Sequence, residues 1–283
     1  MKIPKYWAKS AQAARQPGGQ SYWLAVWQWS DVSLADAQQK AVDKAQELAR
    51  RVQAGEALNR YAYDQRPLRE EMTRGITAGG HEVGVVTRNK YGAQVLNATQ
   101  AMFIDIDIKA LESSGSLAGQ MGRLLGGRGA DPADPYVARV AAWASQHPDL
   151  GLRVYRTFGG LRCLVTNQVF DPTQAQSMDI LRSLGSDPLY VRLCQAQACF
   201  RARLTPKPWR CGIDTPPNQY PWENAAAEAR YRQWEQQYSQ RTATYAVCKL
   251  MKALGPAETH PDIIPVVALH DEITRVAEQR QLA

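Results

Sequence analysis

The seven residues 102–108, Met-Phe-Ile-Asp-Ile-Asp-Ile, constrain the fold of this chain more than any other stretch. Acidic and apolar residues alternate there, and the side chains of a β-strand alternate between the two faces of a sheet. We therefore expect Asp105 and Asp107 to point the same way from one strand. The core positions of the strand are expected to be Phe103, Ile104, Ile106 and Ile108.

Two carboxylates held this close repel each other unless a cation or a shared proton lies between them. Hard oxygen ligands beside open water positions suit Mg²⁺ or Mn²⁺. The pattern thus predicts a divalent metal site at Asp105 and Asp107. An edge strand with two solvated acids is the alternative that this stretch alone leaves open.

Net charge and composition indicate which classes of binding partner and which cellular compartment to expect. The chain has 283 residues and a formal net charge of +7, which predisposes it toward nucleic acid or phosphorylated ligands. Apolar runs stay well short of the roughly twenty residues of a membrane span, and the first residues lack the apolar region of an export signal. We therefore expect a cytoplasmic protein that does not enter a membrane. The five cysteines are odd in number and form no Cys-x-x-Cys pair, so we expect reduced thiols rather than disulfides or a zinc site.

Hydrophobic periodicity predicts an α+β fold with a mainly antiparallel central sheet, flanked by helices, and a C-terminal helical appendage. The acids should lie near the middle of that sheet, and residues 1–20 should form an irregular arm. Trp23, Trp27 and Trp29 share one strand face and are expected in the core. The predicted strands are 22–29, 82–88, 93–97, 102–108, 152–157, 161–166 and 200–204. The predicted helices are 34–54, 135–147, 171–184, 187–197, 225–237, 245–254 and 263–279.

Three regions follow from this order: an N-terminal βα unit at 1–79, a central domain at 80–215 and a helical region at 216–283. Within the central domain, the Gly-rich residues 126–129 are expected to form a surface loop, because no Lys-Ser/Thr ending of a phosphate loop follows them. Basic residues concentrate in residues 201–210. That segment is the predicted anion site.

In this succession the residues resemble the archaeo-eukaryotic primase and primase-polymerase superfamily. The sequence Phe103-Ile-Asp-Ile-Asp107 is similar to the metal-binding strand of that family. The sequence Thr157-Phe-Gly-Gly-Leu-Arg162 looks like its Ser-Gly-x-Gly-x-His hairpin, with Arg162 in place of the histidine and Thr157 in place of the serine. Asp187, with Asp214 as the alternative, corresponds to the later lone acid that precedes a basic segment. The resemblance covers roughly residues 80–215.

The resemblance implies an RRM-like palm that transfers nucleotides from nucleoside triphosphates onto a DNA or RNA 3′-hydroxyl with Mg²⁺ or Mn²⁺. Under it, the catalytic metals would be bound by Asp105, Asp107 and Asp187. The nucleotide would be bound by Arg88, Arg156, Thr157, Arg162, Arg201, Arg203 and Lys207. Nucleic acid would be contacted by Trp209 and Arg210.

Two other functions remain open at this point. A palm domain without the histidine could bind nucleotide or nucleic acid without catalysis. The stretch Phe103 to Lys109 also looks like the metal strand of diguanylate-type nucleotide cyclases, although the Gly-Gly-Asp/Glu-Glu-Phe hairpin of those enzymes is missing from this sequence.

Overall fold

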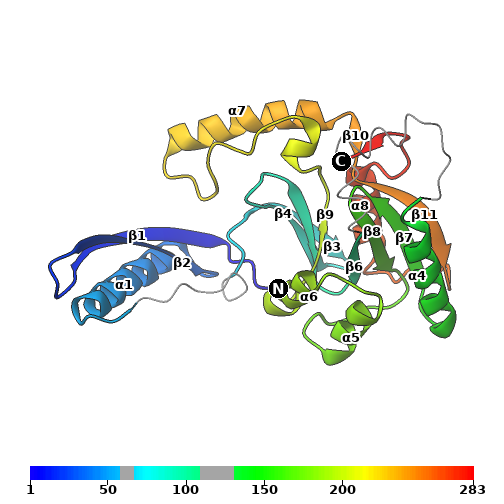
Figure 1. Cartoon of the computed structure of the whole chain (residues 1–283), viewed down its shortest axis with the longest axis horizontal. Coiled ribbons are helices and arrows are strands. Elements are labelled where there is room, and N and C mark those ends of the chain that lie inside the picture. Colours follow the sequence, from blue (N-terminus) through cyan, green and yellow to red (C-terminus); the bar gives the residue numbers. More distant parts are fainter. Residues whose placement is uncertain (58–66, 109–130) are drawn as a thin grey trace. The chain divides into compact units, whose positions relative to one another are not determined.

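The computed structural model describes residues 1–57, 67–108 and 131–283, so the predicted loop at 126–129 lies outside the described residues (Figure 1). The chain divides into two compact units, residues 2–71 and residues 72–283 together with Met1. The fold is mixed, with helices and mostly antiparallel sheets, as predicted. Among the described helices, none has the length and apolar character needed to cross a membrane.

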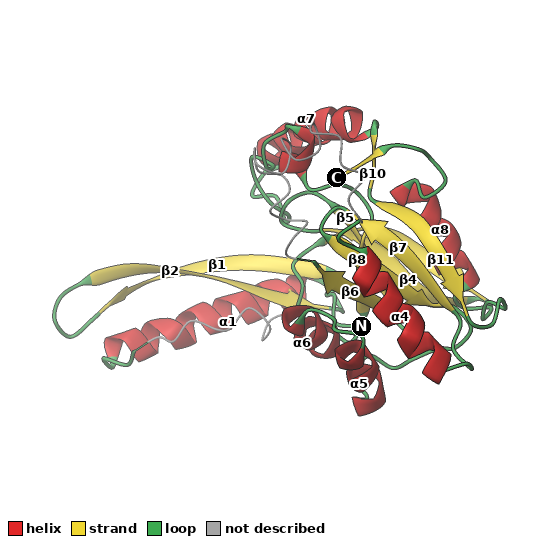
Figure 2. Ribbon diagram, turned by 45° about the vertical axis from the view of Figure 1, so that its right-hand side comes forward, coloured by secondary structure: helices red, strands yellow, loops and turns green. Residues whose placement is uncertain are grey.

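The N-terminal unit is a two-stranded hairpin with one helix packed along it (Figure 2). Strands β1 (Tyr6–Arg15) and β2 (Ser21–Ser30) pair antiparallel over their full lengths, and α1 spans Leu34–Gln53. The Ser33 side chain caps α1 by accepting a hydrogen bond from the backbone N–H of Asp36. A stripe of small residues then lets the helix lie close to the strands: Ala37, Ala41, Ala45, Ala49 and Val52.

Two predictions for this unit are wrong. Residues 6–15 form β1 rather than an irregular arm, because pairing with β2 overrides the low strand propensity of an alanine-rich segment. Ala8, Ala14 and Leu24 face the helix, so the tryptophans of β2 lie on the opposite face of the hairpin. Trp23 is accordingly 73% exposed instead of belonging to a core.

The larger unit contains two four-stranded sheets. One has the strand order β3 (Glu71–Ala78), β4 (His81–Arg88), β5 (Gln94–Ala98) and β9 (Phe200–Arg203). The other has the order β11 (Cys248–Leu254), β7 (Leu152–Thr157), β8 (Gly160–Val165) and β6 (Phe103–Asp107). The remaining elements are α4 (Asp134–Gln146), α5 (Ala175–Ser183), α6 (Pro188–Gln197), η3 (Pro208–Cys211), α7 (Ala225–Thr242), β10 (Tyr245–Ala246), α8 (Ile264–Thr274) and β12 (Gln281–Leu282). One apolar core joins both sheets to α4, α5, α6 and α8.

Strand β6, which carries the acid pair, is an edge strand of its sheet and not the middle strand that we expected. Its neighbour across that edge is β9, the edge strand of the other sheet. The hydroxyl of Tyr190, on α6, bridges the two strands. Its single proton lies within hydrogen-bond distance of the carbonyls of Phe103 (2.9 Å) and Arg201 (3.1 Å), and its oxygen accepts from the Arg201 N–H (3.3 Å). The two sheets therefore meet where the sequence places its acids and its arginines.

The C-terminal region is not the purely helical appendage that we predicted. Residues 248–254 form β11, which pairs with β7 and completes the acid-bearing sheet. The alanine, leucine, methionine and lysine residues there have high helix propensity, but the open edge of β7 provides hydrogen-bond partners that outweigh it. Helix α8 then covers the sheet from the face on which Asp105 lies, as its contacts below show.

The Tyr190 bridge makes a stability prediction. In Tyr190→Phe the carbonyls of Phe103 and Arg201 lose a buried donor, so we expect the free energy of unfolding to fall by about 1–3 kcal/mol. Denaturant unfolding measures this loss. Tyr136→Phe is the matched control, because the Tyr136 ring packs against the core while its hydroxyl makes no hydrogen bond among the described residues; equal losses for the two variants would contradict the bridge.

Candidate functional site

Asp105 and Asp107 project from the same face of β6, as predicted, while Ile104 and Ile106 are buried beneath the opposite face. In the antiparallel pairing with β8, Asp105 lies opposite Arg162 and Asp107 lies opposite Gly160. A Cβ on Gly160 would lie 1.9 Å from the Ile106 carbonyl oxygen. Only glycine permits this close approach of the β7–β8 turn to the acid-bearing strand.

Arg162 is a buried cation that connects four elements. Its Nη1 donates to the Arg203 carbonyl on β9 at 2.9 Å and contacts His270 on α8 and Cys248 on β11. Its Nε lies 3.9 Å from the Asp105 carboxylate and makes no hydrogen bond. Arg162 is 3% exposed, so its charge acts on Asp105 and on β9 from below the surface. The resemblance implied that Arg162 contacts the nucleotide directly. Its burial instead favours an indirect role, through the residues that it touches.

Arg162 is itself held by a histidine and an acid on α8. His270 Nδ1 lies 2.9 Å from an Asp271 carboxylate oxygen, which can only accept, so Nδ1 carries the proton. Nε2 is then left as an acceptor toward Arg162 Nη1 at 3.3 Å. Asp271 also accepts from Arg153 and from the Tyr155 hydroxyl. Burial lowers the pKa of His270 to about 4, although the hydrogen bond with Asp271 acts in the opposite direction; the neutral ring therefore fits an acceptor role.

A cluster of arginines lies beside Asp105. Burial, followed by the neighbouring charges of Arg162 and Arg210, lowers the pKa of Arg203 to about 10, and Asp105 partly opposes this shift. The Arg203 side chain also donates to the Thr205 carbonyl. Arg203 thus lies among the charges of Arg162, Arg210 and Asp105, and Arg162 also lies 3.9 Å from Asp105. Crowded like charges are unfavourable unless an anion lies among them, and guanidinium groups match phosphate oxygens in geometry.

The rim of this cluster carries aromatic rings. The Arg210 guanidinium lies 4.1 Å from the ring centre of Phe158, in the β7–β8 turn, which brings the basic segment next to the glycine opposite Asp107. Lys207 Nζ lies 5.6 Å from the Trp209 ring, and Trp209 meets Tyr91 edge to face. Trp209 is 50% exposed and is therefore accessible for stacking.

Asp187 lies next to the site through its backbone. Its N–H donates to the Asp105 carbonyl at 3.2 Å, and Ser186 donates to the same carbonyl through its hydroxyl. The Asp187 carboxylate, however, accepts from the N–H groups of Leu189 and Tyr190 and caps α6. Within residues 1–57, 67–108 and 131–283, no three acidic, histidine or cysteine side chains form a metal-binding group. The structure thus places Asp187 as a helix cap that touches Asp105 by its main chain.

The other predicted residues are distributed around this cluster. Thr157 is buried on the Asp105 face of the sheet, and Arg201 bonds Tyr190 through its backbone. Arg156 lies on the opposite face, opposite Leu161, and bonds Asp131 and the turn carbonyls. Arg88 pairs with Glu235 on α7, and the Asp214 carbonyl accepts from Trp234. Arg156 is therefore not brought together with the acids.

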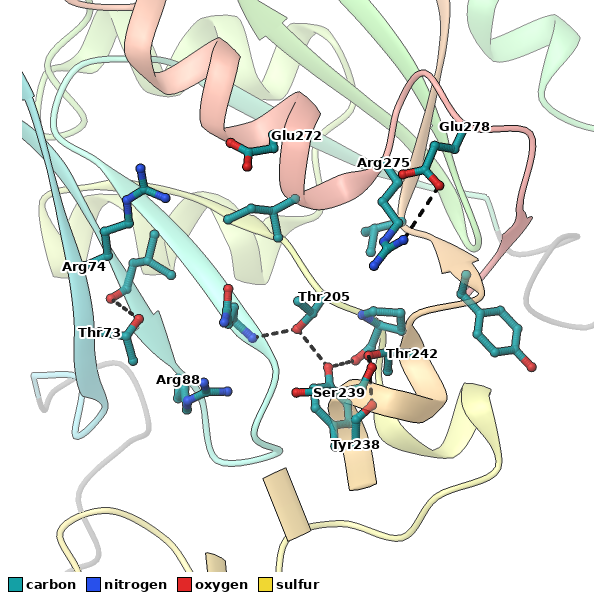
Figure 3. Close-up of a pocket in the computed structure, with 16 residues that line it drawn as sticks. Thr73, Arg74, Arg88, Thr205, Tyr238, Ser239, Thr242, Glu272, Arg275 and Glu278 are labelled. Atoms are coloured by element: carbon teal, nitrogen blue, oxygen red, sulfur yellow. Dashed lines mark hydrogen bonds and ion pairs between the residues drawn. The ribbon is translucent and has the colours of Figure 1, made fainter. Parts of the chain in front are cut away.

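A cavity of about 660 Å³ adjoins the arginine cluster (Figure 3). It is bounded by β3, β4, α7 and α8 and is lined by charged and hydroxyl side chains, among them Arg74, Arg88, Arg275 and Glu272. One of its wall residues, Thr205, connects it to the cluster. The Thr205 carbonyl accepts from Arg203, and the Tyr238 hydroxyl donates to Pro206 and bonds Thr205. The size is in the range of pockets that bind small molecules.

Sequence reasoning missed His270, Asp271, Tyr155, Cys248 and Tyr190 at this site. His270 and Asp271 were expected in a helical appendage away from the site. Cys248 was expected in a helix over residues 245–254 and not in a strand of the acid-bearing sheet. A signal for the pair on α8 was present, because His270-Asp271 directly follows six apolar residues at the start of the helix, Ile-Pro-Val-Val-Ala-Leu. A polar pair in such a helix requires buried partners.

Comparison with protein-family models, with curated proteins and with solved structures gave no match.

The buried histidine predicts a pH dependence of stability. Its pKa is about 4 in the folded chain against an ordinary value of 6.5, so below pH 6.5 the unfolded state binds more protons. The free energy of unfolding should fall as the pH drops from 6.5 to 4, by about 3 kcal/mol at most. Urea unfolding at several pH values measures this slope.

His270→Gln keeps a polar group at this position but cannot titrate, so its unfolding energy should change less with pH over that interval than that of the wild type. A wild-type slope in His270→Gln would contradict the assignment of a buried neutral ring.

Proposed function

We propose that the chain is a primase-polymerase-like nucleotidyltransferase that acts on nucleoside triphosphates and a nucleic-acid 3′-hydroxyl with Mg²⁺ or Mn²⁺. One observation carries the proposal: the acid-bearing strand β6 and the arginine-bearing strand β9 lie side by side, with Asp105 next to Arg162 and Arg203. Phosphoryl transfer requires this combination of carboxylates for cations and guanidinium groups for phosphate oxygens. The RRM-like palm that the motifs resemble is part of the proposal.

The two acids fit a magnesium-type cation. Mg²⁺ is commonly held by one or two carboxylates together with waters and substrate phosphates, so Asp105 and Asp107 can suffice when the nucleotide supplies further oxygens. When bound, the cation would neutralise phosphate charge and lower the pKa of an attacking hydroxyl. Asp187 enters this proposal as a positioning residue, because its carboxylate caps α6 while its N–H holds the Asp105 carbonyl.

The side chains of the chain bind and orient the triphosphate. Arg203 and Arg210 would hold the phosphate oxygens, with Lys207 at the rim. Arg162, buried beneath them, would orient Asp105 and the β9 backbone. The base and sugar would occupy the adjoining cavity of about 660 Å³. The 3′-hydroxyl oxygen then attacks the α-phosphorus and pyrophosphate leaves, a reaction that depends mainly on alignment and charge stabilisation.

A non-catalytic nucleotide- or nucleic-acid-binding module is the second candidate. The observation in its favour is the use of the Asp187 carboxylate as a helix cap, which leaves two acids at the site. The arginine cluster and the exposed ring of Trp209 serve such a module equally well. A nucleotidyltransferase needs the two acids to form product. A binding module does not need them, and their negative charges would oppose its binding of nucleic acid.

The acids provide the decisive test. With Mn²⁺, labelled nucleoside triphosphates and a primed or bare template, we expect extended product on a denaturing gel. Asp105→Asn combined with Asp107→Asn should reduce the rate by on the order of 10²-fold or more, as for the loss of a preorganised charge-stabilising group. Asp179→Asn, an exposed acid on α5, is the control. Absence of product in the wild type, with nucleic-acid affinity retained in the double variant, supports the binding module; cyclic or dinucleotide product from GTP without template supports a cyclase.

The arginine cluster provides an independent test. Arg203→Ala removes a charge-assisted contact with phosphate, so the KM for nucleoside triphosphate should rise roughly 10- to 100-fold. Steady-state kinetics, or equilibrium binding of a labelled triphosphate, measures this change. Arg182→Ala, on the exposed side of α5, should leave both values unchanged. An unchanged KM in Arg203→Ala would remove this arginine from the nucleotide site.

A further inference from the structure

The hairpin of the N-terminal unit has one face covered by α1 and a second face that becomes exposed toward the hairpin turn. Helix α1 covers the face that carries Ala8, Ala14 and Leu24 (Figure 2). The antiparallel register assigns the alternate residues of β1 and β2 to the other face. We call this the open face and define it by Trp7, Lys9, Arg15, Trp23, Trp27 and Trp29.

The open face combines indole rings with positive charge. The remaining strand positions on it are Ala11, Ala13, Ser21 and Ala25, so the two strands contribute no carboxylate to this face. The Trp27 ring already carries cations, with the Arg69 guanidinium 4.5 Å and Lys9 Nζ 5.9 Å from its centre. This is the chemistry of a surface that accommodates a polyanion with aromatic groups.

Exposure of the rings increases along the face. Trp7 is buried, bonds the Pro4 carbonyl through its indole N–H and packs against Trp29 at 5.5 Å. Trp23, near the hairpin turn, is 73% exposed. Its cross-strand partner is Ala13, and Arg15 is the next residue of β1 on the same face. Small neighbours, Ala13, Ser21 and Ala25, leave both sides of this ring approachable. Arg15 is the diagonal neighbour of Trp23 across the strands, and its Nε donates to the Gly19 carbonyl in the hairpin turn.

From this arrangement we propose that the open face binds single-stranded nucleic acid, with Trp23 stacking on an unpaired base and Lys9 and Arg15 contacting phosphates. Unpaired bases offer the flat apolar surface that an exposed indole accepts, whereas the bases of a duplex are already stacked. Sequence-tolerant single-strand binding characteristically uses stacking rings in a positively charged groove. This site is separate from the acid and arginine cluster and does not rest on the function proposed for that cluster.

The test uses the full chain and fluorescence anisotropy with a labelled oligothymidylate of about twenty nucleotides, long enough for several stacking contacts. Trp23→Ala should raise the Kd about tenfold, as for the loss of one stacked base. Tyr22→Ala is the matched control, because Tyr22 is the adjacent residue on the helix-facing side of the same strand. It should leave the Kd within about twofold, a change of under 0.5 kcal/mol by the same conversion.

Charge is tested separately from stacking. Lys9→Glu should weaken binding and make the dependence of log Kd on log salt less steep by about 0.7 for the phosphate contact that is lost. Arg50→Glu, an exposed position on α1, carries the same charge change on the other side of the hairpin and should leave the slope unaltered. If circular dichroism shows that Trp23→Ala alters folding, the comparison of Lys9→Glu with Arg50→Glu tests the binding site by itself.

Three outcomes would overturn the proposal. They are equal Kd values for Trp23→Ala and Tyr22→Ala, equal salt slopes for Lys9→Glu and Arg50→Glu, or duplex DNA binding as tightly as the single strand with the same dependence on Trp23. The variant with Asp105→Asn and Asp107→Asn should retain the contribution of Trp23. Failure of nucleotidyl transfer and failure of this binding site are therefore distinguishable.

Discussion

The burial of the Arg162 guanidinium is the interaction on which the larger unit depends. A cation that is 3% exposed is costly to remove from water unless partners surround it. Here the partners come from β6, β9, β11 and α8: the Asp105 carboxylate, the Arg203 carbonyl, Cys248 and His270. One side chain thereby contacts the acid-bearing sheet, the arginine-bearing sheet and the C-terminal helix.

In the family that the motifs resemble, one residue of the hairpin occupies the position of Arg162 and binds phosphate. In this chain the residue at that position and the residues suited to bind phosphate are different ones. The hairpin motif places a phosphate-binding histidine where this chain has Arg162. In this chain the histidine that touches that position is His270, from a different helix, and it is neutral and buried. In the proposed function, phosphate contact falls to Arg203 on β9 and to Arg210 in the turn after it. Arg162 and His270 would then act beneath the surface, as positioning residues.

The two proposals divide the molecule between its two units. The larger unit offers carboxylates, guanidinium groups and a cavity, which are the requirements for holding and reacting a triphosphate. The N-terminal unit offers indole rings and cations on a two-stranded platform that has α1 on its other face. Under the two proposals, one site does chemistry on a strand end and the other holds an unpaired strand, and tethered sites raise each other's effective concentration.

The sequence by itself determined the alternating strand with both acids on one face, the glycine turn at 159–160 and the basic strand at 200–204. These follow from local rules, because strand periodicity, glycine conformation and charge density are properties of neighbouring residues. Local rules also predicted most helices of the larger unit.

Only the tertiary structure decided where those pieces meet. Residues 6–15 and 248–254 became strands because an unpaired strand edge supplied their hydrogen bonds, against their own propensity. Asp187 caps a helix, and Arg156 points to the far face, because of helix geometry and strand register rather than residue type. Arg162 and His270 are 108 positions apart in the chain, and contacts between such distant residues depend on how the elements pack, which no pattern of neighbouring residues records.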